Sequence, residues 1–244
     1  MPSQQSRDRY WEISSGFDSS RGTYGAVEST SVNYIPFGAA YHVGAWTLSL
    51  DSGFVKVKGP LDFVEIANLL NGNFNPSAPG PGTAAVQGIA DSMLGVKYAV
   101  FEDLEQGLFV DLGGRLRVPT ASQSKGLGTG HVAGDLQLDV TKALGRWSVF
   151  SAVEYGIRDG RDGDRNPWSA SAGVSRSLTE QLSAGAFYHW RQSAWAGGRA
   201  AHEVFAYAAY RFNQHFSLFL YGATGFSPQS VNRELGVRYS YRWP

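Results

Sequence analysis

The feature that most constrains the fold is the alternation of residues 232–243, which read N-R-E-L-G-V-R-Y-S-Y-R-W. Apolar or aromatic side chains occupy every second position from Leu235 to Trp243, and Arg238 and Arg242 lie in the alternate positions. Because successive side chains of a strand point to opposite faces, the stretch predicts a strand with one apolar and one charged face. An edge strand of a soluble sheet would show the same pattern, so the remaining chain must decide between the two.

The same period of two recurs along the chain and predicts about 12 strands. The expected strands are residues 10–18, 31–43, 46–51, 91–101, 108–118, 135–141, 146–158, 168–178, 182–193, 203–212, 216–226 and 232–243. Most are roughly 9–13 residues long, which suits a tilted strand that crosses a bilayer. An even strand number is typical of single-chain bacterial barrels. Pro36 cannot donate to a strand ladder, so we expect a bulge or bend there.

Short connections alternate strictly with long polar ones. The short connections are 44–45, 104–107, 145–146, 180–181 and 214–215, and the long ones are 19–28, 59–88, 121–130, 159–167 and 195–200. Periplasmic turns and extracellular loops of outer-membrane barrels alternate in this way, which would place both termini on the periplasmic side. A soluble sandwich has no reason to keep all its long loops at one end.

We therefore expect an all-β chain that forms a single antiparallel up-and-down transmembrane β-barrel. The barrel would cover residues 10–244, after a flexible segment at 1–9 and with a long extracellular loop at 59–88. Residues 61–70 place apolar side chains on one face of a short helix, which would cap the barrel mouth or fold into it. A solvated surface loop with one packed helix is the alternative.

Composition excludes several other classes. Lys and Arg total 21 and so do Asp and Glu, so no net charge favours a nucleic-acid partner. The absence of cysteine excludes disulfides, thiolate catalysis and cysteine metal sites. The first residues, M-P-S-Q-Q-S, lack the apolar core of a signal peptide. Because a barrel requires export, we expect a mature form with an added Met, located in the bacterial outer membrane after removal of the signal peptide.

The closing strand resembles the C-terminal signal by which the barrel-assembly machinery recognises outer-membrane barrels. The residues that carry this likeness are Gly236, Tyr239, Tyr241 and Trp243. Aromatic residues also gather at the strand ends. Trp46, Trp147, Phe216, Tyr241 and Trp243 fall at the short-turn ends, and Trp168, Trp190 and Trp195 at the long-loop ends. This distribution is typical of interfacial girdles, although aromatic residues favour strands in general.

Several motifs resemble an outer-membrane transporter family associated with phenol-degradation (meta-cleavage) pathways. They are G-I-A-D-S-M-L-G-V-K-Y from Gly88, R-L-R-V-P-T from Arg115, G-L-G-T-G from Gly126, D-L-Q-L-D-V-T-K-A-L-G-R-W-S-V-F from Asp135 and L-T-E-Q-L-S from Leu178. The likeness covers most of residues 88–243 and rests on turns and strand starts. It implies a small barrel that passes small molecules, with aromatic or apolar compounds as candidates, and it brings no catalytic residues.

If the apolar faces meet lipid, the charged faces line the lumen. The candidate pore-lining residues are Asp111, Arg115, Arg117, Asp135, Asp139, Glu154, Arg158, His189, Arg191, Glu203, Arg211, Glu234, Arg238 and Arg242. Charges of both signs are tolerated inside only if they are hydrated or paired. The acidic residues concentrate on the middle strands and several arginines on the late ones, which predicts opposed walls and a transverse field. A network of salt bridges that plugs a narrow barrel is the alternative.

Passive diffusion of small molecules through a charged lumen is thus the expected function. The partners would be outer-membrane lipid and lipopolysaccharide, the barrel-assembly machinery and a small-molecule solute, with no nucleic acid and no cofactor. A closed structural or adhesive barrel, or a lipid-modifying enzyme, are the alternatives. No catalytic site is expected, because G-L-G-T-G lacks the Lys-Ser/Thr of a phosphate loop, no G-x-S-x-G occurs, and His189 falls on the charged face. The spacing of His131, Asp135 and Asp139 permits a metal site, but ordinary lumen polarity explains it better, so no metal is expected.

Overall fold

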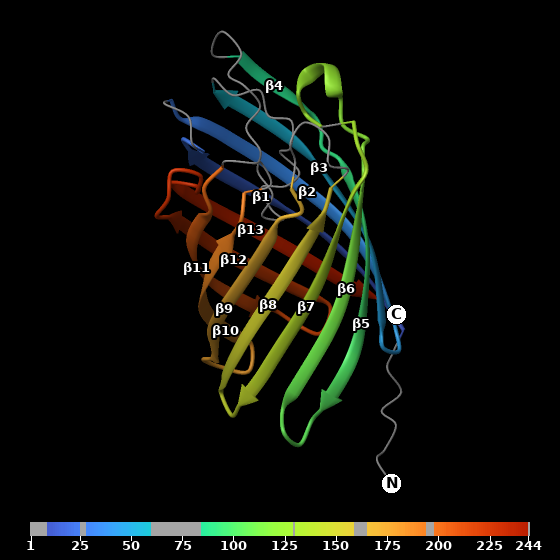
Figure 1. Ribbon diagram of the computed structural model, residues 1–244. Helices are drawn as coiled ribbons and strands as arrows, with labels where there is room; N and C mark the ends of the chain where they lie inside the picture. The colour runs from blue at the N-terminus through green and yellow to red at the C-terminus, as the bar shows by residue number, and fades with distance from the viewer. Residues whose placement is uncertain are drawn as a thin grey trace.

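The chain folds as a sheet of thirteen strand segments in a computed structural model (Figure 1), which describes residues 9–24, 28–59, 84–128, 130–158, 165–193 and 198–243. The segments are β1 (Tyr10–Gly22), β2 (Thr30–Val43), β3 (Trp46–Gly59), β4 (Ala84–Ile89), β5 (Ser92–Asp103), β6 (Leu108–Val118), β7 (Ala133–Leu144), β8 (Trp147–Ile157), β9 (Trp168–Ser177), β10 (Leu182–Arg191), β11 (Ala201–Arg211), β12 (Phe216–Gly225) and β13 (Arg233–Trp243). A short 3₁₀ helix, η2 (Gln123–Lys125), lies between β6 and β7. None of the helical structure in these ranges is long and apolar enough to cross a membrane.

The sheet closes on itself, because β1 pairs antiparallel with both β2 and β13. One end of β3 pairs with β5 from Trp46 to Asp51, and the other end pairs with β4 from Phe54 to Gly59. The segments β4 and β5 are therefore two halves of one strand that is interrupted at Ala90 and Asp91. Counted in this way, the fold is the expected closed antiparallel barrel of twelve strands.

Several strand boundaries differ from the expectation by one to three residues, and three differences are larger. The first strand runs past Asp18 to Gly22, the third continues to Gly59, and residues 84–89 form β4 where a loop was expected. These extensions support one another by pairing, since Gly22 lies opposite Thr30 and Gly59 opposite Ala84. The helix expected at 61–70 lies outside the described residues.

Of the bulge or bend expected at Pro36, the register excludes the bulge. The register between β1 and β2 is the same on both sides of it, with Ser15 opposite Phe37 and Asp18 opposite Tyr34. Only Gly16 and Phe17 lack a paired residue on β2. The Ser15 hydroxyl donates a hydrogen bond to the Pro36 carbonyl at 2.8 Å. A side-chain donor thus takes the place of backbone pairing next to the residue that lacks an N–H.

The apolar side chains of the strands point outward. Leu138, Val149 and Leu220 expose 44%, 46% and 47% of their surface, far too much for a dry barrel centre. This orientation confirms the expected membrane-facing side. An outward aromatic pair such as Trp46 and Tyr98 marks the short-turn end, and Tyr155 packs against Trp168 at the long-loop end, as girdles would. Trp195 lies outside the described residues.

The two ends of the barrel differ in their connections. Short turns join β2 to β3, β5 to β6 and β7 to β8 at the lower end in Figure 1. Gly44 and Gly145 open two of these turns with φ angles of 57° and 64°, which the first position of a type II′ hairpin requires. Trp11 lies opposite Trp243, so the first and last strands meet at this same end.

Candidate channel lumen

The fourteen charged residues named from the sequence occupy the positions that alternate with the outward apolar side chains. They fall into layers along the barrel. Arg117, Asp135, Arg191, Glu203 and Glu234 lie near the long-loop end and expose less than 10% of their surface. Asp111, Arg115, Asp139, Glu154, His189 and Arg238 lie in the interior, Arg158 follows β8, and Arg211 and Arg242 lie near the short turns.

The layer near the long loops is held by buried ion pairs. Arg158 binds Asp135 at 3.1 Å, and their side chains are only 3% and 4% exposed. Glu203 contacts both Arg191 at 3.8 Å and His189 at 3.6 Å. Buried charges of this kind persist only when each has a partner, so this layer is a packed network.

Ion pairs also occur deeper in the barrel, between near-neighbour strands. Their members are Arg115 with Glu154, Lys97 with Asp139 at 2.9 Å, Arg238 with Asp18 at 3.2 Å, and Arg242 with Glu12. Each cation thus neutralises a carboxylate close by. These pairs contradict the expected opposed walls of acidic and basic charge. Arg238 and Arg242 pair with carboxylates of β1, Arg191 contacts Glu203 of β11, and the middle carboxylates have cations among them.

Four of the inward charges were missing from the sequence-based set, namely Glu12, Asp18, Asp51 and Lys97. The signal for all four was present, because they alternate with outward residues such as Trp11, Leu50 and Tyr98. Asp18 is the most consequential omission. It binds Arg238 and also accepts a hydrogen bond from the Tyr221 hydroxyl.

An aromatic ladder on the inner wall was also missed. Its members are Phe150 on β8, Phe187 on β10, Phe205 and Tyr207 on β11, and Phe219 and Tyr221 on β12. The Phe187 ring stacks on the Phe205 ring, with their centroids 4.7 Å apart. The centroid of the Phe187 ring lies 6.1 Å from that of Phe150. Tyr207 lies 5.2 Å from Phe219, and Phe219 lies 5.7 Å from Tyr221. The sequence signal was that these rings share the phase of His189 and Glu203, not the phase of the outward residues.

Glycines let these rings lie against the wall. A methyl group on Gly185 would collide with the Tyr207 ring, and one on Gly236 would collide with the Tyr221 ring. Gly173 on β9 leaves the same kind of room between Phe150 and Phe187. Each ring therefore occupies the space that a side chain on the adjacent strand would fill if the glycine were another residue.

A small apolar cluster lies inside the barrel toward the long-loop end. Tyr24, Leu127 and Val231 come from three different loops and pack onto the inward valines of β2 and β3, among them Val55 and Val57. All five expose 3% or less of their surface. Burial raises the pKa of the Tyr24 phenol, so this hydroxyl stays protonated and can pair with Ser20 at 3.1 Å. We call this cluster the apolar plug.

Polar contacts hold two of these loops in place. The Asp91 carboxylate accepts a hydrogen bond from the Ala121 N–H at 2.9 Å, which fixes the loop that carries Leu127. Glu203 accepts one from the Val231 N–H at 3.0 Å. The plug is therefore tied to the barrel wall at the interruption between β4 and β5 and on β11. No sequence motif predicted these two contacts.

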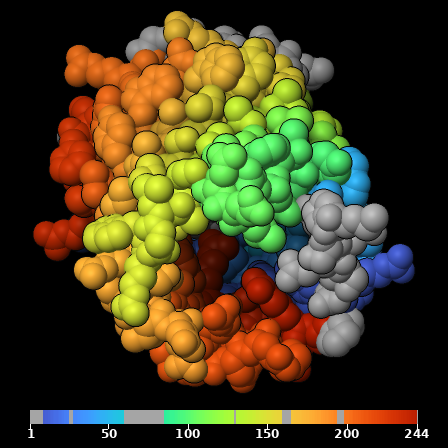
Figure 2. Space-filling view, turned by 90° about the horizontal axis from the view of Figure 1, so that it is seen from below, coloured from blue at the N-terminus to red at the C-terminus, as the bar shows by residue number. Residues whose placement is uncertain are grey.

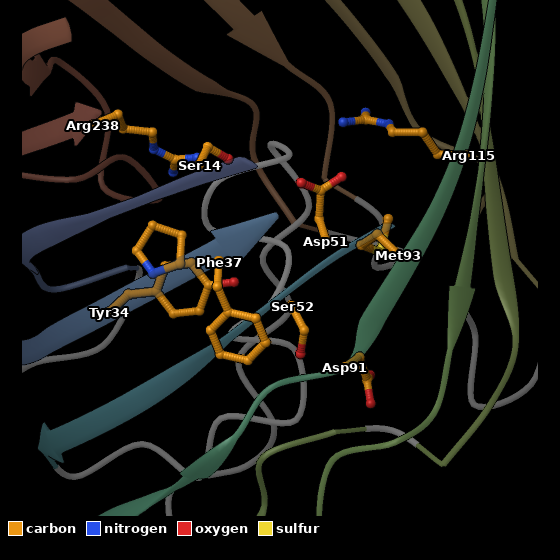
Figure 3. A pocket seen from close by; sticks show the side chains of 10 residues that line it. Ser14, Tyr34, Phe37, Asp51, Ser52, Asp91, Met93, Arg115 and Arg238 are labelled. Atoms are coloured by element: carbon orange, nitrogen blue, oxygen red, sulfur yellow. The ribbon is translucent and has the colours of Figure 1, made fainter. Parts of the chain in front are cut away.

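The opposite end of the barrel is hollow. Figure 2 views the molecule from the short-turn end and shows an opening into its centre. A cavity of about 190 Å³ lies inside (Figure 3), between β1, β2, β3, β5, β6 and β13. Tyr34, Asp51, Met93, Arg115 and Arg238 are among its lining residues.

His131, Asp135 and Asp139 do not form the metal site that their spacing permits. Within the described ranges, no three side chains of the ligating types come close enough together to hold a metal ion. Asp135 and Asp139 instead bind Arg158 and Lys97.

Residues 15–243 match the family described as "Putative MetA-pathway of phenol degradation". The chain belongs to this family. No curated protein is significantly similar to it. The match covers nearly all of the barrel, and it confirms the resemblance found in the sequence motifs.

Solved structures share the fold at low sequence identity. The NanC porin is 10% identical, with a TM-score of 0.57 over 94% of this chain and 97% of that one. The β-domain of the Bordetella autotransporter BrkA is 13% identical, with a TM-score of 0.56 over 96% and 99%. The CymD monoaromatic hydrocarbon channel aligns more loosely, at 13% identity and a TM-score of 0.48 over 98% and 89%.

Fold, family and outward apolar face together place this protein among the β-barrels of the bacterial outer membrane. At this level of identity, the NanC and BrkA structures show that the chain shares their β-barrel fold.

Proposed function

We propose that this protein is an outer-membrane channel for passive diffusion of small molecules, with ring-bearing, largely apolar solutes as its preferred class. The aromatic ladder is the observation that carries this proposal. Phe187 and Phe205 present stacked rings on an inner wall, where lipid contact cannot explain them. Aromatic surfaces bind other rings by stacking and edge contacts, weakly enough at each step to allow release.

The ion pairs on the other strands complement the ladder. Because Arg115, Arg238 and Lys97 are each neutralised by a carboxylate, they keep water in the lumen without holding one solute charge strongly. The remaining expectations accompany this proposal: termini on the periplasmic side, contact with lipopolysaccharide, and reading of Gly236, Tyr239, Tyr241 and Trp243 by the assembly machinery.

Influx into proteoliposomes tests the proposal. Phenyl glucoside and methyl glucoside carry the same sugar, which prevents unaided passage through lipid, and phenyl glucoside is the larger molecule. A size filter admits methyl glucoside faster, whereas stacking in the lumen predicts faster influx of phenyl glucoside. The double variant Phe187→Ala/Phe205→Ala should lose this preference.

Two outcomes would contradict the proposal. One is an order of influx that follows size alone in the wild type. The other is no influx of either glucoside through folded protein, with the apolar plug in place or released, which would favour a closed structural barrel.

A further inference from the structure

The cavity in the lumen contains a carboxylate whose position is unlike that of its neighbours. Asp51 lies on the inner face of β3 and is exposed to the cavity (Figure 3). Within the described residues it forms no ion pair and accepts a side-chain hydrogen bond from Ser49. A carboxylate has about four acceptor positions, so most of its capacity faces open space.

The two arginines nearest Asp51 attract it electrostatically, but among the described residues neither forms an ion pair with it. Figure 3 shows Arg115 and Arg238 reaching toward the cavity from opposite sides of Asp51. Arg115 is bound to Glu154 and Arg238 to Asp18 at 3.2 Å. Each arginine is paired with a carboxylate of its own, and Asp51 and Asp91 both line the cavity, so negative charge is in excess there. The cavity therefore favours a cationic or hydrogen-bond-donating group over an anion.

The rest of the cavity suits an apolar ring. Tyr34, Pro36 and Met93 line it, and the Tyr34 ring lies over Gly53, where any side chain would collide with it. The volume of about 190 Å³ exceeds that of cavities known to bind benzene, which are about 150 Å³. One single-ring molecule therefore fits.

The cavity also joins the aromatic ladder. Tyr221, the last ring of the ladder, donates a hydrogen bond to Asp18, and Asp18 binds Arg238 on the cavity wall. The last ring of the ladder is therefore a close neighbour of the cavity wall.

We infer that this cavity is a binding subsite for a small aromatic molecule that carries one hydrogen-bond donor, an ammonium or a hydroxyl group, with Asp51 as the acceptor. This inference rests on the proposed channel function and adds the polar group that the solute carries. An ammonium group would form a charge-assisted hydrogen bond with Asp51, and a hydroxyl group a neutral one.

Equilibrium dialysis against the detergent-solubilised barrel, with protein-free micelles as the blank, measures the subsite directly. The probes are benzylammonium, benzyl alcohol and benzoate, which share one ring and differ in the polar group. We expect affinity in the order benzylammonium, benzyl alcohol, benzoate. Asp51→Ala should weaken benzylammonium binding at least tenfold. Asp51→Asn keeps an amide oxygen as acceptor, so it should weaken benzylammonium similarly but leave benzyl alcohol within about threefold.

Asp139→Asn is the matched control, because it also removes one carboxylate of the interior, one that is paired with Lys97 and does not line the cavity. It should change benzylammonium binding less than twofold. Equal binding of the three probes, or an equal loss in Asp139→Asn and Asp51→Ala, would overturn the subsite. Dialysis measures binding and does not require conduction. The subsite proposal can therefore be contradicted while glucoside influx supports the channel, and the channel proposal can be contradicted while the probes bind as expected.

Discussion

Individual charges inside this barrel differ widely in how much the fold depends on them. Arg158 and Asp135 are almost completely buried, and Arg158 also donates to the Gly134 carbonyl at 2.9 Å. Arg242 and Glu12 form the same kind of pair near the short turns, with side chains 49% and 22% exposed. Solvent can replace a lost partner at the second site but not at the first.

Asp135→Ala is therefore expected to lower the free energy of unfolding by about 3–5 kcal/mol, because it leaves a buried guanidinium without its carboxylate. Glu12→Ala should lower it by less than about 1 kcal/mol. Urea unfolding in lipid vesicles, followed by tryptophan fluorescence, measures both. Similar losses in the two variants would show that burial does not set the strength of these pairs.

At the scale of elements, the loop between β6 and β7 contributes Leu127 to the apolar plug. Asp91 holds this loop by the bond to Ala121. At the other end of the barrel, Asp103 makes an equivalent bond to the Gln106 N–H at 2.9 Å, within a short turn. The two carboxylates make the same contact, but only one of them ties down a plug.

Asp91→Ala should raise the ionic conductance of the barrel in planar bilayers several-fold, since the loop with Leu127 loses an attachment to the wall. Asp103→Ala should leave the conductance unchanged. Heat-modifiable migration in electrophoresis would confirm that both variants remain folded. An unchanged conductance in folded Asp91→Ala would mean that the plug does not depend on this bond.

Elements with a regular period were predictable from the sequence, and packed loops were not. The strand at 108–118 was placed at its observed bounds, because Leu112 and Leu116 alternate with Asp111 and Arg115. The segment β4 was missed, because its inward residues are apolar and pack under Leu127, so the usual outward-apolar pattern is absent. The aromatic ladder was missed for the same reason, because its inward residues are apolar. Where both faces of a strand are apolar, the period of two does not show which face contacts lipid.

For the molecule as a whole, the lumen carries a charge bias that the full chain does not. The chain has equal numbers of acidic and basic residues. On the inner face of the described strands, acidic side chains outnumber basic ones, with Asp51 as the clearest unpaired case. A negative lumen attracts cations and repels anions.

We therefore expect the open barrel to be cation-selective. In a planar bilayer with a KCl gradient, the reversal potential should have the sign set by K⁺, and Asp51→Asn should move it toward zero. The Asp91→Ala variant provides a larger current for the same measurement. A reversal potential set by chloride would show that the bias of the described strands is outweighed elsewhere in the chain.

The seam between β1 and β13 has a consequence for how the molecule is made. Arg242 binds Glu12 and Arg238 binds Asp18 across sequence separations of 230 and 220 residues. During synthesis β1 is made before β13. Until β13 pairs with it, the backbone N–H and C=O groups along one edge of β1 have no hydrogen-bond partner, and a hydrocarbon environment cannot supply one. We therefore expect the strands to insert into the bilayer together and late in folding, because a chain that lacks β13 cannot close the sheet and has no stable inserted structure.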